Sequence, residues 1–183
     1  MAYTIQTAES GILPIASTDS GIISPYNANT GSTTTIPTPP LRPGMIVRAQ
    51  DPTYGEGEFI LLAGVASTAV GSLVVYNTSS YTTTLAPVTA NLAQPLAVAM
   101  SANTSATTWG WYQIGGVAVV AKSTNVNFAP NVAVGLRSTG KIGGTSSGKE
   151  IQGARSANSA TVASATTTIS VMINRPHAQG RVS

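Results

Sequence analysis

Residues 59–76 read FILLAGVASTAVGSLVVY, a run of eighteen residues without a charged side chain. A run of this length could cross a membrane as a helix, but its composition favours strands. Gly64 and Gly71 divide it into two short aliphatic and β-branched runs, Phe59 to Leu62 and Leu73 to Tyr76, with Ser, Thr and Ala between them. The stretch therefore predicts two strands and no membrane span.

The rest of the chain from Gly44 onward continues this pattern. Short β-prone runs alternate with Gly, Asn and Ser at the spacing typical of sandwiches and barrels, and no window shows a sustained 3.6-residue apolar repeat with helix start and stop signals. We expect strands near residues 46–48, 59–62, 73–76, 85–88, 95–100, 109–115, 117–121, 132–136, 150–152 and 167–174. The sequence thus predicts a single all-β domain, a β-sandwich or compact β-barrel that is jelly-roll-like or related, over residues 45–176.

The first 44 residues differ from this domain. They hold six of the eleven prolines, which remove backbone donors and favour extended geometry, so they predict an extended N-terminal arm. Its apolar side chains are candidate contacts with another surface of the same domain or of a neighbour, and disorder before assembly is the alternative. These candidate contact residues are Ile12, Leu13, Ile15, Ile22 and Ile23. Residues 177–183 are predicted to form a short polar tail.

Charged residues are unusually rare. They make up 8% of the 183 residues, against about a quarter in an ordinary globular protein. Because a soluble monomer normally keeps a charged surface, the neutral one predicted here suggests that other subunits cover much of it. The nine basic residues are scattered without a run, and the aromatic cluster at residues 109–112 has no basic neighbour before Lys122, so we expect no nucleic-acid partner.

Compartment and metal chemistry are limited by the same composition. The chain has no cysteine, which excludes disulfides and thiolate metal sites. Its first ten residues, MAYTIQTAES, lack the basic and apolar regions of a secretory signal, so we expect the chain to stay in the cytoplasm where it is made.

The groups available for acid–base or nucleophilic chemistry are few. One histidine, His177, lies in the predicted tail, where a solvated role is expected. The carboxylates are Glu9, Asp19, Asp51, Glu56, Glu58 and Glu150. Three of them fall in the stretch from Asp51 to Glu58, whose spacing does not fit the known calcium loop. We predict a Pro/Gly turn with solvated or interface-facing charges, and an ion site is the alternative. We expect no enzyme activity, no metal and no cofactor.

A glycine-rich loop raises the possibility of phosphate binding. Gly143, Gly148 and Lys149 fall on the spacing of a phosphate-binding loop, but Glu150 stands where that loop needs a hydroxyl. The residues that follow show no helix signal, so no helix N-terminus would face the anion. A strand-to-strand loop is the better interpretation.

The segment Trp109-Gly-Trp-Tyr112 has three interpretations. In a strand, Trp109 and Trp111 lie on one face while Tyr112 lies on the other. The indole pair could belong to the core, to a contact between subunits, or to a sugar-stacking platform. We include both tryptophans among the candidate interface residues.

Three stretches resemble segments of small head proteins of tailed bacteriophages, and the class that fits is the decoration, or cement, protein. They are residues 48–59, RAQDPTYGEGEF, residues 64–72, GVASTAVGS, and residues 109–116, WGWYQIGG. The resemblance covers roughly residues 45 to 175. It implies a β-sandwich or barrel that binds the outside of an icosahedral shell as a small homo-oligomer and clamps neighbouring major capsid subunits. It supplies no catalytic residues.

The expected function is accordingly that of a virion structural protein on the capsid exterior, with the major capsid protein as partner and no membrane association. We expect a homo-oligomer, with a trimer favoured and a dimer as the alternative. Two other functions stay open. One is a carbohydrate- or receptor-binding β-sandwich that uses Trp109 and Trp111, and the other is a further virion part such as a tail component.

Overall fold

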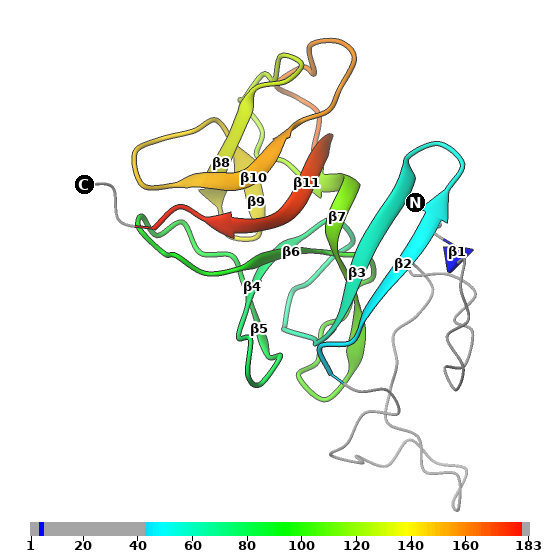
Figure 1. Cartoon of the computed structure of the whole chain (residues 1–183). Coiled ribbons are helices and arrows are strands. Elements are labelled where there is room, and N and C mark those ends of the chain that lie inside the picture. Colours follow the sequence, from blue (N-terminus) through cyan, green and yellow to red (C-terminus); the bar gives the residue numbers. More distant parts are fainter. Residues whose placement is uncertain (1–3, 6–42, 181–183) are drawn as a thin grey trace, which may run out of the picture.

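The computed structural model describes residues 4–5 and 43–180. Within these ranges the chain forms eleven strands and no helix, which confirms the predicted all-β class (Figure 1). The strands are β1 Thr4–Ile5, β2 Ile46–Asp51, β3 Gly55–Ala63, β4 Leu73–Tyr76, β5 Thr83–Leu85, β6 Leu96–Ala99, β7 Trp109–Ala121, β8 Ala133–Ser138, β9 Lys141–Gly143, β10 Glu150–Ser156 and β11 Thr168–Ala178. Apart from Thr4–Ile5 and residues 43–44, the predicted arm lies outside the described residues. In the described part of the chain, no helix could span a membrane.

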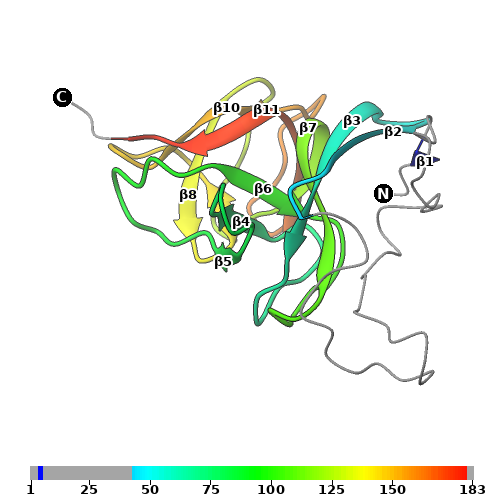
Figure 2. The same ribbon diagram turned by 60° about the horizontal axis from the view of Figure 1, so that its bottom comes forward.

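All the strands belong to one curled antiparallel sheet. Its main path runs in the order β1-β2-β3-β7-β11-β10-β8-β9. Off this path, β6 pairs with β7, β4 pairs with β6, and β5 pairs with β4. Seen after a 60° turn, the β8–β11 half curls over β4 and β6, while β2 and β3 extend away from it (Figure 2). The architecture is therefore a half-barrel with a projecting hairpin.

Strand β7 joins the two halves. Its residues 109–115 pair with β3 and its residues 115–121 pair with β11. The sequence predicted two strands separated at Gly116, and this was wrong, because the chain continues as one strand that accommodates Gly116 at φ +89°. A Cβ added there would lie 2.3 Å from the carbonyl oxygen of Glu56, so only glycine fits without a shift of the backbone.

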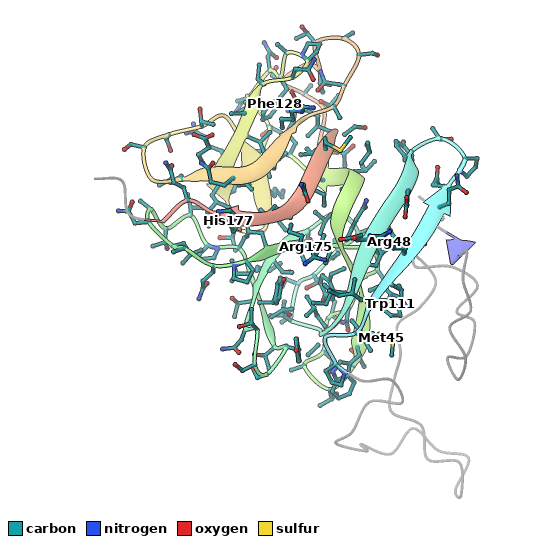
Figure 3. All side chains as sticks on the ribbon, in the orientation of Figure 1. Met45, Arg48, Trp111, Phe128, Arg175 and His177 are labelled. Atoms are coloured by element: carbon teal, nitrogen blue, oxygen red, sulfur yellow. The ribbon has the colours of Figure 1, made fainter. Side chains whose placement is uncertain are left out.

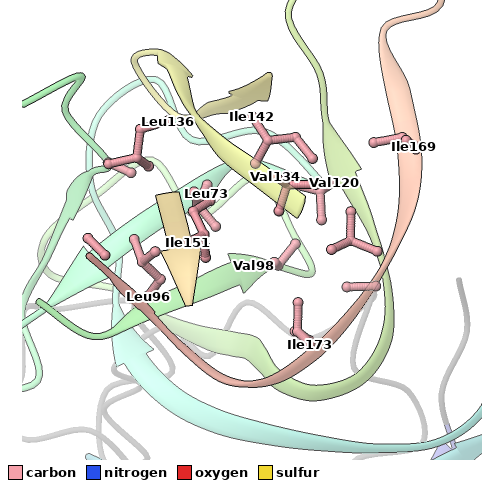
Figure 4. Packing of buried hydrophobic residues seen from close by; sticks show 14 of the residues in the cluster. Leu73, Leu96, Val98, Val120, Val134, Leu136, Ile142, Ile151, Ile169 and Ile173 are labelled. Atoms are coloured by element: carbon pink, nitrogen blue, oxygen red, sulfur yellow. The ribbon is translucent and has the colours of Figure 1, made fainter. Parts of the chain in front are cut away.

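The main core lies inside the curl. Strands β4 and β6 send alternate side chains to its two sides, so both of their faces are buried, which explains why residues 73–76 are uniformly apolar. On one side, Leu73, Leu96 and Val98 meet residues of β7 to β11 (Figure 4). On the other side, Val74 and Ala97 pack against a second cluster that includes Tyr112.

A third cluster lies on the outer face of β2, β3 and β7. In β3, Ile60 and Leu62 belong to the second cluster, whereas Phe59 and Leu61 point the opposite way. We call this third group the outer cluster. Its members are Ala49, Phe59, Leu61, Met100 and Trp111, with Met45, Val47, Tyr54 and Trp109 packed against them.

Several boundaries differ from the prediction. β2 and β10 run further than expected, to Asp51 and Ser156, and β3 begins earlier, at Gly55. Residues 141–143 form β9 where the sequence indicated only a loop, and β5 ends at Leu85, where a strand over residues 85–88 was expected. Strand β11 continues through His177 and Ala178, which the sequence placed in a polar tail. Ala178 pairs with Ile151 and is buried, so the chain stays in the sheet to that point.

Candidate binding site

A cleft opens where β3 and β11 separate along β7. Along β7, Gly115 is the last residue to pair with β3, where it lies opposite Glu58, and the first to pair with β11, where it lies opposite Asn174. Beside this point lies a cavity of about 740 Å³. Its charged lining residues are Arg48, Glu56, Glu58, Arg155 and Arg175, and glycines form much of the remaining wall. We call it the arginine cleft.

Glu58 connects the two sides of the arginine cleft. Its Oε1 accepts from Nη2 of Arg48 at 3.2 Å, and its Oε2 accepts from Nε of Arg175 at 3.5 Å. Arg48 also lies 3.7 Å from Glu56 through its Nη1. Both arginine side chains are about two-thirds exposed, at 67% and 65%, so each ion pair contributes only about 0–1 kcal/mol. The pairs orient the guanidinium groups more than they stabilise the fold. Figure 3 shows Arg48 of β2 and Arg175 of β11 near one another.

The backbone at Arg175 is strained. Between the pairs Gln152–His177 and Ala154–Ile173, the three residues 174–176 of β11 lie opposite the single residue Gly153. This bulge places Arg175 at φ +43°, a left-handed conformation that costs a residue with a side chain about 1–3 kcal/mol. Bulges turn side chains away from the regular pleat, and here the turned side chain is the one that reaches Glu58 in the arginine cleft.

The arginine cleft is suited to binding carboxylate or phosphate oxygens. A guanidinium presents several N–H donors in a plane, which matches such oxygens in pairs. Arg155 makes no ion pair within the described ranges, so its donors remain open to a partner group. Within the same ranges, no group of three His, Cys, Asp or Glu side chains could hold a metal ion.

The acidic stretch from Asp51 to Glu58 divides between two roles. Asp51 is buried, and its Oδ1 accepts hydrogen bonds from the backbone N–H groups of Thr53 at 2.7 Å and Tyr54 at 3.0 Å. It thus holds the turn between β2 and β3, as the predicted turn requires. Glu56 and Glu58 line the arginine cleft beside Arg48. The carboxylates therefore face basic groups and backbone donors, an arrangement that disfavours the alternative of an ion site.

The two tryptophans share one face of β7, as predicted. Trp111 is fully buried in the outer cluster and Trp109 is half-buried against it. The indole of Trp111 therefore belongs to the interior of this chain, and it offers no exposed surface for a subunit contact or for sugar stacking. Its Nε1 is buried and has no hydrogen-bond partner in the described structure. The other predicted contact residues, Ile12, Leu13, Ile15, Ile22 and Ile23, lie outside the described residues.

The glycine-rich loop joins strands, as predicted. It runs from β9 into β10, and Gly148 adopts φ +72° in the turn before Glu150. Because a strand follows Lys149, no helix N-terminus faces this loop, and the geometry needed for a phosphate-binding loop is not formed.

A buried lysine was not singled out from the sequence. Lys122 follows β7, and its Nζ donates to the backbone carbonyl oxygens of Ser123 at 3.1 Å and Ser164 at 3.2 Å. Burial lowers its pKa. The lysine links the end of β7 to the loop before β11. Because Lys122 and Ser164 are 42 positions apart, no local sequence pattern predicts this contact.

Comparison of the chain with protein-family models, with curated proteins and with solved structures finds no match.

Proposed function

We propose that this protein is a capsid decoration protein that binds the outer surface of a tailed-phage head as a homo-oligomer and clamps neighbouring major capsid subunits. The proposal draws on the resemblance of three of its segments to small head proteins. The observation that carries it is the uneven distribution of charge over the described surface.

Eleven of the fifteen charged residues lie within the described ranges. Five line the arginine cleft and two, Asp51 and Lys122, are buried. The other four are Arg137, Lys141, Lys149 and Glu150, which lie on or next to β8, β9 and β10. Large parts of the body, including β4 to β7, thus carry no charged side chain at their surface. Such a surface supports association through wide contact area, with the surface charges of the described residues confined to the arginine cleft and the β8–β10 region.

The edge of the sheet supports the same function. On its outer side, β2 is paired within the described residues only at Ala49 and Gln50, by β1. Next to this short pairing, Ile46 is an exposed large apolar side chain. Edge strands with open backbone groups pair readily with another chain, and natural proteins usually protect them. The β2 edge is therefore suited to strand addition from a neighbouring subunit.

Mechanistically, each copy holds its neighbours through modest contacts that are repeated over a lattice. The uncharged faces supply area, and the arginine cleft fixes register by pairing its arginines with acidic groups of the neighbour. Linking many such contacts raises their effective concentration, so the lattice resists the outward pressure of packaged DNA without a single strong interface.

One alternative loses support and one does not. A carbohydrate platform on Trp109 and Trp111 conflicts with the burial of Trp111. A tail component, by contrast, would use the same neutral surfaces, so the experiment must separate head from tail.

The test is to locate the chain in virus particles from its source. Electron microscopy of intact particles should show an 18.5-kDa density on the outside of the shell, and stripping the protein should lower the internal pressure that heads withstand. Purified protein should also cosediment with stripped heads. Density along the tail, or rods formed by the isolated protein, would assign it to the tail instead. Absence from particles would overturn any role in the virion.

A further inference from the structure

The arginine cleft adjoins a second cavity along the outer face of β11. This second cavity has a volume of about 690 Å³. Met172 lines the arginine cleft and Ser170 lines the second cavity. The two side chains lie on the same face of β11, because the residue between them, Val171, is buried in the main core. The opposite wall of both cavities comes from the β2–β3 hairpin, residues 53–58. We call the two cavities together the long groove.

Charge is confined to one half of the long groove. All its charged lining residues belong to the arginine cleft, and among the described residues that line the second cavity none is charged. Glu56 and Glu58 already contact Arg48 or Arg175. Arg155, by contrast, is exposed and makes no ion pair in the part of the chain that the structure describes. This half of the groove can therefore accept one more carboxylate.

An apolar patch lies beside Arg155. The side chain of Met172 is 39% exposed, which is unusual for a large apolar residue of the described body. Met172 pairs with Arg155 on one side and with Val117 on the other, so the three residues form a row across β10, β11 and β7. Neighbouring strands lie about 4.8 Å apart, so the two apolar residues lie roughly 5–10 Å from Arg155. A ligand that uses the whole row needs a carboxylate and an apolar group separated by about that distance.

An extended peptide meets this requirement. In an extended chain, the side chains at positions i and i+2 point the same way and lie about 7 Å apart. The long groove follows β11 from Asn174 to Ser170, a length of about 13 Å that holds roughly four or five residues of an extended chain. Gly115 and Gly153 in the wall of the arginine cleft have no side chains that would keep a peptide backbone away.

Nucleic acid and a lone anion fit the long groove less well. A phosphate chain needs cations along its whole path, but the second cavity supplies none among the described residues, and Glu56 and Glu58 would repel it. A small anion would contact Arg155 and leave Met172 exposed. The observations therefore favour a protein segment that carries both an acidic and an aliphatic side chain.

We propose that the long groove binds an extended segment of another chain in which an acidic residue is followed two positions later by an aliphatic one. The carboxylate accepts hydrogen bonds from Arg155, and the aliphatic side chain covers Met172 and Val117. Glu58 holds the guanidinium groups of Arg48 and Arg175 at one end of the groove. That the partner is a neighbouring capsid subunit rests on the proposed function, whereas the recognition chemistry rests on the long groove alone.

Short peptides test the recognition chemistry in solution. The full chain, isotopically labelled for NMR, is titrated with acetyl-Ser-Glu-Ser-Leu-Ser-amide and with two analogues, in which Gln replaces Glu or Ser replaces Leu. We expect the amide signals of Gly153, Arg155 and Met172 to shift with the first peptide. Binding should be about tenfold weaker when Gln replaces Glu and about fivefold weaker when Ser replaces Leu. Equal binding of the Glu and Gln peptides, or no shift of these signals at about 10 mM peptide, would overturn the proposal. Tighter binding of single-stranded oligothymidylate would also overturn it.

Arg155→Gln and Arg137→Gln form a matched pair of variants. Both residues are exposed arginines, but Arg137 lies on β8 and does not line the long groove. Arg155→Gln should bind the Glu peptide about tenfold more weakly and lose the preference for Glu over Gln, while Arg137→Gln binds like the wild type. Equal effects of the two substitutions would refute binding in the groove.

Cosedimentation with stripped heads separates the role of the long groove from the capsid role. We expect less Arg155→Gln than Arg137→Gln to cosediment. If the wild type and Arg155→Gln cosediment equally, the capsid role stands and binding of the neighbour through the groove is refuted. If the wild type does not cosediment but still selects the Glu peptide over the Gln peptide, the capsid role fails and the groove is supported as a site for acidic segments.

Discussion

The substitution Gly116→Ala tests whether the close approach of β7 and β3 requires glycine at position 116. Gly116 has φ +89°, and an added Cβ would lie 2.3 Å from the carbonyl oxygen of Glu56 and 3.0 Å from Cα of Gly57. Both neighbours are backbone atoms that no side-chain rotation can move. The two strands would therefore have to separate next to the arginine cleft.

Gly55→Ala provides the matched control. Gly55 has a similar φ of +76°, but an added Cβ there meets nothing within 4 Å. In both variants the left-handed conformation costs roughly 1–2 kcal/mol, offset by about 0.4–1 kcal/mol from the smaller conformational freedom of the unfolded chain. We expect Gly55→Ala to lower the free energy of unfolding by about 1 kcal/mol on this account.

Gly116→Ala adds the steric term. Overpacking of this kind costs typically 1–3 kcal/mol, so the total loss should be about 2–4 kcal/mol. At about 2–4 °C per kcal/mol for a chain of this size, the melting temperature should fall by roughly 4–16 °C. Urea unfolding monitored by tryptophan fluorescence measures both variants, with the midpoint moving and the slope unchanged. Equal losses for Gly55→Ala and Gly116→Ala would refute the argument that close backbone contact requires glycine at position 116.

Three further predictions concern charge, burial and alkaline pH. Glu58→Gln should remove the ionic contacts to Arg48 and Arg175 but lower the free energy of unfolding by no more than about 1 kcal/mol, because the pairs are exposed. Adding about 1 M salt should erase the difference between the variant and the wild type. A larger loss that does not depend on salt would contradict this prediction. Trp111→Ala should destabilise the protein by about 3–5 kcal/mol and Trp109→Ala clearly less, since only Trp111 is fully buried, and urea unfolding followed by circular dichroism would reveal any reversal of this order. Burial raises the pKa of Tyr112 from 10.0 to about 12, so between these pH values the folded state keeps a proton that the unfolded state loses. The free energy of unfolding should therefore be unaffected by this group below pH 10 and fall by up to about 2.7 kcal/mol toward pH 12. In Tyr112→Phe, urea unfolding measured between pH 10 and pH 12 should show a smaller fall.

The strands that the sequence located best are those whose burial is simplest. Residues 73–76 are buried on both faces and bounded by turn residues, so composition alone gave their limits. β9 was missed because residues 140–144 read GKIGG, a composition typical of a loop, and the short strand forms through backbone pairing with β8, which is not a local property of the sequence. β7 was divided in two because a glycine pair normally ends a strand, whereas here the same glycines let one strand change partners.

The arginine cleft could not be found from the sequence. Arg48 and Glu58 are ten residues apart, and Arg175 is 117 residues from Glu58, so only the sheet order brings the three together. The alternation of side chains between the two faces of a strand, by contrast, is a local property, and it correctly placed Trp109 and Trp111 on one face. The curl of the sheet decides whether this face is buried, and the local sequence pattern does not predict the curl.

The sharing of β7 between β3 and β11 bears on how the body comes apart. β7 is hydrogen-bonded to both halves, so separating it from one half also disturbs its pairing with the other. We therefore expect neither half to melt separately. We expect the described body to unfold in a single cooperative transition, with the slowest amide exchange along the middle of β7. If the protein coats a particle as proposed, each copy should unfold in one step on heating, and the coat should not soften gradually.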